Sequence, residues 1–277
     1  MPELPEVETV RRDLQDALTG RRLVGAAATG QRTVRRHGSA GPLVARTQGR
    51  KVAGVDRRGK YLLVRLDTAD VVVVHLGMSG QLRLVPAGTP ALAHTHVRWQ
   101  LDDGRELRFV DPRTFGEVFV AAPGAGGVPA ELAHLGPDAL EGVPDAASLG
   151  RLLAGRRRRI KPLLLDQQVV AGIGNIYADE ILWAARIGPD RPAGALGGAA
   201  LRRLHPAMRD ILLAAIAHRG SSIADEQYRD LAGVVGSYQL HHRAYGREGR
   251  PCARCGRPIR RVSDGGRSTF SCPRCQR

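Results

Sequence analysis

Apolar residues near the N-terminus recur at helical spacing. Val7, Val10, Leu14 and Leu18 lie three or four positions apart and follow Pro5, a residue that the first turn of a helix tolerates. The run ends near residue 20, a glycine suited to a helix C-terminus. The pattern therefore predicts that an amphipathic helix opens the chain.

The next hundred residues carry short runs rich in β-branched residues. An Asp-Asp-Gly sequence at 102–104 predicts a hairpin turn between two of them. Many short strands at this spacing are typical of a β-sandwich or barrel. The predicted strands cover residues 60–66, 71–76, 81–85, 97–101, 106–110 and 117–120.

The second half of the chain changes to helical spacing. Residues 121–150 are rich in Gly, Pro and Ala and predict a connector, with a short helix over 131–135. Helices are then predicted over 163–168, 176–186 and 201–219. The expected fold is α+β, divided into a β-sandwich domain with a leading helix (1–120), the connector (121–150), a helical domain (151–240) and a Cys-rich tail (241–277).

The charge of the chain predicts a polyanionic partner. Its 42 Lys and Arg residues against 27 Asp and Glu give a net charge of +15, and each neutralised phosphate releases condensed counterions. A coding bias towards Arg is the alternative, but the charge is clustered. Residues 156–159 are four consecutive arginines, and residues 241–277 hold ten arginines against two acidic residues. This distribution indicates nucleic-acid binding.

The chain also carries signals about its compartment. No run approaches the roughly 18 apolar residues of a membrane span, and Met1-Pro2-Glu3 lacks the basic start of a signal peptide. We therefore expect a cytoplasmic protein with no membrane partner.

The cysteines predict one structural zinc ion. Two Cys-x-x-Cys pairs are separated by a 16-residue spacer, in a tail too poor in apolar residues to fold without metal. Two disulfides are the alternative, which the expected cytoplasmic location disfavours. Arg267 lies between the pairs, where a β-hairpin would project it. The predicted ligands are Cys252, Cys255, Cys272 and Cys275.

Several motifs, in order along nearly the whole chain, resemble bacterial formamidopyrimidine-DNA glycosylase. The resemblance implies a bifunctional glycosylase and AP lyase that excises oxidised purines, such as 8-oxoguanine and formamidopyrimidines, from duplex DNA. It implies a helix-two-turn-helix in the helical domain, a zinc-finger β-hairpin, and action as a monomer at the nucleoid. The motifs lie at 1–9 (MPELPEVET), 58–62 (RGKYL), 75–80 (HLGMSG), 111–116 (DPRTFG), 172–180 (GIGNIYADE) and 245–247 (YGR), followed by the zinc tail.

The resemblance also implies the catalytic residues. Removal of Met1 would leave Pro2 with a secondary amine as the nucleophile. Glu3 would be the acid and base that protonates the opening sugar, and Glu6 would support it. Complementarity to the helix dipole would explain both acids without catalysis. Lys60 and Arg267 would act near the phosphates during elimination, although a solvated Lys is the usual role of such a residue.

Other residues match DNA-contacting positions of the family. Met78, Arg113 and Phe115 match residues that fill the space left by an extruded nucleotide, although Met78 and Phe115 could equally be core residues. We expect the loop to be extended, so that Arg113 and Phe115 point the same way. Asn175 is predicted to cap a helix and expose amide donors to a phosphate. The remaining expected contacts are His75, His94, Arg157 and Lys161.

The sequence departs from the family at a few positions and leaves two rivals. Thr114 stands where many relatives have Arg, Arg157 where they often have Lys, and 231–233 where a lid over the base, expected within 221–240, often has Asp-Gly. One rival is an endonuclease VIII-type glycosylase for oxidised pyrimidines, disfavoured by Leu4 and the Arg113 loop. The other is a non-catalytic zinc-ribbon DNA-binding protein, which would leave the N-terminal motif unexplained.

Overall fold

The chain forms two compact units. The computed structural model describes residues 1–222 and 228–277. Unit 1 contains residues 1–134 and 218–237, and unit 2 contains residues 135–217 and 238–277. The division lies inside the expected connector. It differs from the expected domains at residues 218–237, which leave the helical domain and pack with the N-terminal one.

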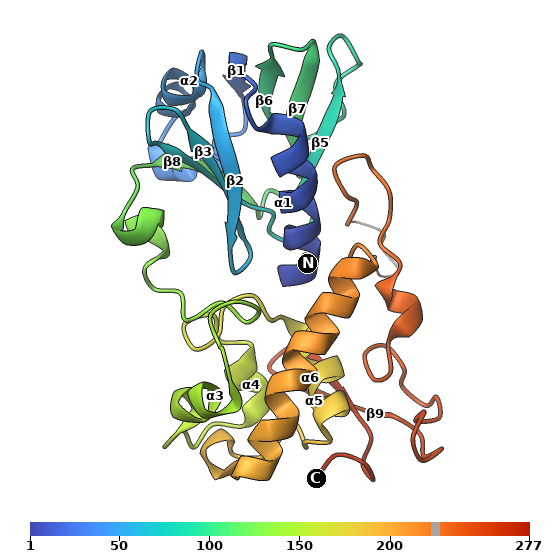
Figure 1. The fold of residues 1–277 in the computed structure, drawn as a ribbon. Coiled ribbons are helices and arrows are strands. Elements are labelled where there is room, and N and C mark those ends of the chain that lie inside the picture. The colour runs from blue at the N-terminus through green and yellow to red at the C-terminus, as the bar shows by residue number, and fades with distance from the viewer. Residues whose placement is uncertain (223–227) are drawn as a thin grey trace. The chain divides into compact units, whose positions relative to one another are not determined.

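Unit 1 is a β-sandwich of two four-stranded antiparallel sheets (Figure 1). One sheet has the order β1-β6-β7-β5 and the other the order β2-β3-β4-β8. The predicted turn at 102–104 joins β6 to β7, with Gly104 at a φ of 80°. The strands are β1 (Leu23–Ala28), β2 (Val52–Arg58), β3 (Tyr61–Leu66), β4 (Val71–His75), β5 (Gln81–Pro86), β6 (Thr95–Leu101), β7 (Arg105–Val110) and β8 (Glu117–Ala121).

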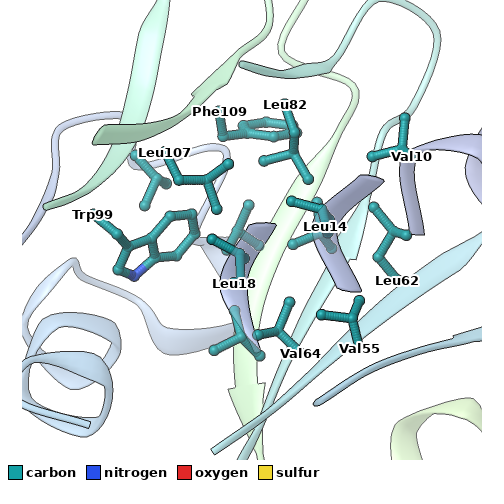
Figure 2. Packing of buried hydrophobic residues seen from close by; sticks show 14 of the residues in the cluster. Val10, Leu14, Leu18, Val55, Leu62, Val64, Leu82, Trp99, Leu107 and Phe109 are labelled. Carbon is teal, nitrogen blue, oxygen red and sulfur yellow. The ribbon is translucent and has the colours of Figure 1, made fainter. Parts of the chain in front are cut away.

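Helix α1 (Leu4–Leu18) fills the space between the sheets. Its residues Val10, Leu14 and Leu18 lie between side chains of both sheets, as Figure 2 shows. Leu14 and Leu18 are completely buried. The helical period seen in the sequence is therefore the stripe that joins the two sheets into one core.

The segment 218–237 is attached to unit 1 by two buried side chains and a backbone hydrogen bond. Tyr228 and Leu231 are buried in the same core as α1, and the Leu231 carbonyl accepts a hydrogen bond from Leu84 N on β5 at 3.3 Å. Neither contact has a periodic signature in the sequence. Because these contacts leave no periodic pattern, the predicted boundaries placed residues 218–237 in the helical domain.

Unit 2 is built on helices and a zinc-finger hairpin. Helix α6 (Gly198–Ala217) packs along α5 (Asn175–Ala185) and α3 (Ala146–Leu153), and Figure 1 shows α5 and α6 side by side. Helix α4 (Ile160–Leu164) contacts α5. Strands β9 (Arg260–Asp264) and β10 (Arg267–Ser271) form an antiparallel hairpin in the tail.

The sequence pattern missed or misplaced the elements with weak local signals. Strands β1 and β2 and helix α2 (Gly41–Thr47) were not predicted. The expected connector contains α3, whose N-cap Asp145 accepts a hydrogen bond from Ser148 N at 2.7 Å. The helix expected at 131–135 is a 3₁₀ turn, Ala130–Leu132. The helix expected at 163–168 begins earlier, at Ile160, and ends at Leu164.

Candidate functional site

The first turn of α1 holds the motif residues of the N-terminus. Pro2 is buried, and Glu3 is 2% exposed and forms the N-cap. Glu6 Oε2 accepts a hydrogen bond from Glu3 N at 2.8 Å, which completes a reciprocal capping box between the two glutamates. The helix therefore fixes the backbone on which Pro2 sits.

Lys60 is held at the same end of unit 1. It follows Gly59, whose φ of 57° makes the tight turn between β2 and β3, and it is 7% exposed. Arg57 Nε donates to Glu8 Oε2 of α1 at 3.1 Å, while Arg57 Nη1 donates to the Gly59 carbonyl at 3.0 Å. These bonds connect the Lys60 turn to the helix that begins with the motif. Figure 1 shows β2 beside α1.

The loop 111–116 is organised by a carboxylate that the sequence analysis did not single out. Asp111 is completely buried. Its Oδ1 accepts from Ser79 Oγ at 2.5 Å, and its Oδ2 accepts from Gly116 N at 2.7 Å. The Asp-Pro start of the motif is a typical turn signal and could have indicated this role. Asp111 thereby holds the two ends of the loop together and fastens it to the loop that contains Met78.

Phe115 and Arg113 project from this loop. Phe115 is 43% exposed, so it is not a core residue, and the Arg113 guanidinium lies 5.2 Å from its ring centroid. The loop is not extended as expected, because Thr114 has a φ of 53°. A Cβ on Gly77 would lie 2.6 Å from the Phe115 carbonyl carbon. The Met78 and Phe115 loops are therefore in contact, and Met78 is partly buried.

The two candidate histidines differ in environment. His75 ends β4 opposite Glu117, and its ring is tilted by 38° against the Tyr61 ring with centroids 4.6 Å apart. Burial, outweighing the attraction of Glu117, lowers the pKa of His75 to about 4. It is therefore a neutral hydrogen-bonding group at neutral pH. His94 is exposed at a φ of 63°, and its carbonyl accepts from Asp111 N at 3.0 Å.

Part of the expected lid is anchored at α1. Ser221 N donates to Glu6 Oε1 at 2.7 Å, and Tyr228 OH donates to the Glu6 carbonyl at 3.4 Å. Ser222 Oγ donates to the Tyr228 carbonyl at 2.8 Å. Glu6 therefore joins the N-cap Glu3 to this segment. Residues 223–227 of the expected lid lie outside the described residues.

Lys161 is not an exposed DNA contact. It is 3% exposed, and its Nζ lies 2.8 Å from Asp179 Oδ1. The same ammonium donates to the Ser268 carbonyl at 2.9 Å and to Thr269 Oγ1 at 3.0 Å. Asp179 in turn accepts from Phe270 N at 3.0 Å. The buried ion pair fastens the zinc-finger hairpin to α4 and α5. The described contacts of Lys161 therefore position the hairpin, and its contact with DNA stays a prediction.

Asn175 does not cap α5. The N-cap is Gly174, which leaves Asn175 as the first helical residue. Its Nδ2 donates to the Ser268 carbonyl at 3.0 Å, while its Oδ1 is buried without a hydrogen-bond partner among the described residues. Arg157 and Arg267 are both exposed. Arg267 begins β10 after a two-glycine turn, so the hairpin projects it as expected.

The four cysteines converge on one point. All four sulfur atoms lie within 4.8 Å of one another, and Cys255 and Cys272 are 3.5 Å apart. None of the four forms a disulfide. Four thiolates at about 2.3 Å from a tetrahedral zinc would lie about 3.8 Å apart, so the arrangement fits this ion. The cysteines form a structural zinc site and leave no position open for catalysis.

Comparison with known proteins explains why these features occur together. Residues 1–118 match the family described as formamidopyrimidine-DNA glycosylase N-terminal domain, residues 135–227 its H2TH domain, and residues 249–277 the zinc finger found in FPG and IleRS. The chain belongs to the formamidopyrimidine-DNA glycosylase family. A non-catalytic zinc-ribbon protein is excluded, because the family match covers the N-terminal domain as well as the finger.

Individual members of the formamidopyrimidine-DNA glycosylase family match the whole chain. The formamidopyrimidine-DNA glycosylase of Salinispora arenicola is 47% identical over 100% of this chain and 96% of its own. The crystal structure of MutM (Fpg) from Thermus thermophilus is 41% identical with a TM-score of 0.87, covering 99% of this chain and 98% of that one. Lactococcus lactis Fpg in complex with DNA containing an abasic site is 33% identical with a TM-score of 0.87, covering 99% of each chain.

The helices of this family member carry no membrane signal. Among residues 1–222 and 228–277, no helix is both long and apolar enough to cross a bilayer.

Proposed function

We propose that this protein is a DNA glycosylase and AP lyase that removes oxidised purines from duplex DNA, with Pro2 as its nucleophile. The observation that carries the proposal is the buried Pro2-Glu3 start of α1, in a chain that matches formamidopyrimidine-DNA glycosylases over its whole length. The net charge of +15 suits a DNA substrate.

The chemistry follows from a secondary amine at Pro2. After Met1 is removed, the nitrogen attacks the sugar C1′, and the bond from C1′ to the base breaks with its electron pair leaving on the base. The Pro2 nitrogen gives up its proton, and the C1′–O4′ bond then breaks with its electron pair on O4′, which takes a proton from Glu3. The iminium that forms between Pro2 and C1′ is a cation, so it acidifies the C2′ hydrogen. Loss of that proton expels the 3′ phosphate, and a second elimination expels the 5′ phosphate. Water then releases the sugar fragment from Pro2.

Neighbouring groups move protons and neutralise charge in these steps. Glu3 is the acid and base at the sugar, because it is adjacent to Pro2 and buried. Glu6 positions it through the 2.8 Å bond from Glu3 N. Lys60, held by the Arg57 and Gly59 contacts, supplies a cation for phosphate and proton transfer. Arg267 supplies a second cation from the zinc finger.

The exposed loops of unit 1 hold the opened duplex. Phe115 wedges into the base stack beside the vacancy, Met78 fills it, and Arg113 hydrogen-bonds the orphaned cytosine. This assignment is supported by the exposure of Phe115 and by the adjacent Arg113 guanidinium. His75, His94, Arg157 and Asn175 are proposed phosphate contacts. His75 would act as a neutral donor because of its low pKa.

The protein is proposed to act as a monomer at the nucleoid in the cytoplasm. A DNA substrate and four free thiols around a zinc site suit a reducing compartment that contains the chromosome.

Borohydride trapping tests the nucleophile. The native protein should form a covalent adduct with duplex DNA carrying 8-oxoguanine opposite cytosine, because borohydride reduces the iminium to a stable amine. Pro2→Gly and Glu3→Gln should abolish normal turnover, whereas Glu131→Gln, an exposed carboxylate of unit 1, should not. No adduct with the native protein would refute the proposed enzyme.

An uncleaved N-terminus gives a separate test of the same nucleophile. A protein that retains Met1 or an N-terminal extension should bind lesion DNA but form no adduct, because its Pro2 nitrogen is an amide. Adduct formation by such a protein would place the nucleophile elsewhere.

The lesion class is tested by a substrate panel. Excision should be faster for 8-oxoguanine and formamidopyrimidines than for thymine glycol. Thymine glycol belongs in the panel because a structural relative, Lactococcus lactis Fpg, has been solved with DNA containing an oxidised pyrimidine. Faster excision of thymine glycol would favour the endonuclease VIII-type alternative.

A further inference from the structure

Helix α5 carries three consecutive attachments to the zinc-binding tail. Asp179 accepts from Phe270 N of the hairpin at 3.0 Å. Glu180, completely buried, accepts from the backbone N of residues 243–245 at 2.8 to 2.9 Å. One turn further along, Trp183 packs against Cys252. The first two attachments hold the hairpin and the segment that leads to it, and the third reaches the metal site.

Trp183 places a hydrogen-bond donor at the metal site. The side chain is 8% exposed and clusters with Cys252, Cys272 and Phe270. Its Nε1 is buried and has no hydrogen-bond partner in the described part of the chain. Cys252 lies in the same buried cluster, so its sulfur is the polar atom that this cluster offers to the donor. An indole N–H can only donate, so the sulfur is the acceptor available to it.

The Arg254 side chain lies over the ring of Trp183. Its guanidinium lies 3.7 Å from the centre of the Trp183 ring, and Nη2 donates to the Ala184 carbonyl at 3.0 Å. Nη1 donates to the Trp183 carbonyl. These are carbonyls of the last turn of α5, where backbone partners are incomplete; the Trp183 carbonyl also accepts from Arg186 N at 3.2 Å. Arg254 lies between Cys252 and Cys255, so one side chain joins the first cysteine pair to the helix and to its tryptophan.

We propose that Trp183 is part of the zinc site: its indole N–H donates to the zinc-bound thiolate of Cys252 and slows release of the metal. A zinc-bound thiolate keeps negative charge that an N–H donor stabilises, and groups that hydrogen-bond metal ligands orient them. Arg254 fixes the ring in the orientation that this bond requires. The inference concerns the zinc site alone and does not depend on the proposed enzymatic function.

Zinc transfer to a chromophoric chelator measures the contribution of the indole. Trp183→Phe keeps an aromatic ring under Arg254 but removes the N–H. We expect this variant to lose zinc on the order of 10-fold faster than the wild type, the lower end of the effect seen when partners of metal ligands are removed. Trp99→Phe is the matched control, because the chain has two tryptophans and Trp99 lies in unit 1. Equal zinc release by wild type and Trp183→Phe would overturn the proposal.

A second measurement uses the unaltered protein, so it does not depend on how a variant folds. The two indole N–H groups give separate NMR signals. Replacing zinc with cadmium should shift the Trp183 signal, because its acceptor is a metal-bound sulfur. The Trp99 signal should stay in place, because its Nε1 donates to Thr47 Oγ1 at 3.2 Å. A Trp183 signal that ignores the metal exchange would show that no bond to the thiolate exists.

Discussion

At the scale of single residues, buried carboxylates position the functional segments. Glu6, Asp111 and Glu180 are each no more than 1% exposed. Glu6 and Glu180 accept backbone N–H groups from segments distant in sequence, and Asp111 accepts the N–H of Gly116 in its own loop and the hydroxyl of the more distant Ser79. A buried charge is costly unless it is hydrogen-bonded. Each carboxylate therefore specifies one arrangement of its loop. Surface ion pairs such as Arg159 with Asp190 contribute little by comparison.

Substitution of Phe115 and of Phe109 should affect excision and stability differently. Phe115→Ala removes a side chain that is 43% exposed, so we expect little change in stability but a large loss of excision from duplex DNA. Phe109→Ala removes a completely buried ring and should cost about 3–5 kcal/mol of unfolding free energy. Urea titration and excision assays on both variants check this. Normal excision by folded Phe115→Ala protein would show that Phe115 does not wedge into the base stack.

His242 should make stability depend on pH. Burial lowers its pKa to about 4 in the folded protein, against ~6.5 in the unfolded chain. The unfolded chain therefore binds the proton first. The stabilisation that depends on a neutral His242 ring is fully present above pH ~6.5. It is lost as the pH falls towards 4, where the free energy of unfolding is lower by about 3 kcal/mol. Urea titrations across this range should show a shallower fall for His242→Gln. Parallel curves for the two proteins would contradict the assignment. His75→Gln should flatten the curve independently.

At the scale of elements, close approaches of backbone decide where the candidate residues meet. The segment after α6 passes so near α1 that a Cβ on Gly220 would lie 2.7 Å from Glu6 Oε1. The loop after β4 approaches the Phe115 loop equally closely at Gly77. Glycine is required at both places, since both also have positive φ, 80° and 63°. Such approaches join elements that are far apart in the chain.

Gly220→Ala tests the approach to Glu6. The substitution should cost stability through its positive φ and should also displace the Glu6 carboxylate, lowering excision. Gly38→Ala is the matched control in unit 1, because Gly38 has a φ of 69° and no atom of the described residues lies within 4 Å of its Cβ position. The control should lose about 1 kcal/mol of stability and keep its activity. Equal activity of the two variants would show that Glu6 needs no fixed position.

At the scale of the whole molecule, unit 1 and the zinc-binding tail of unit 2 depend on different sources of stability. Unit 1 has a large apolar core between its sheets. The zinc-binding tail buries few apolar side chains, and two members of its small cluster are the ligands Cys252 and Cys272. Metal binding therefore supplies the folding free energy that the tail lacks.

Removing zinc should unfold the tail while leaving unit 1 folded. After chelation, amide signals of residues 249–277 should collapse, and the Trp99 indole signal should persist. Binding to duplex DNA should weaken, because Arg267 loses its fixed hairpin. Added zinc should restore both the signals and the binding, which controls for irreversible damage. A hairpin that persists without metal would refute this dependence.

Features that are local or that repeat along the chain could be predicted from residue spacing and type. The helical stripe of α1, six strands, the 102–104 turn, the zinc ligands and the family motifs could all be read from spacing and residue type, because they depend on neighbours in the chain. Tertiary structure alone decided which groups are buried and which segments meet. In the folded chain Lys161 is buried under the hairpin, the N-cap of α5 is Gly174 and not Asn175, and residues 218–237 belong to unit 1. These outcomes depend on contacts between distant residues, which leave no period in the sequence.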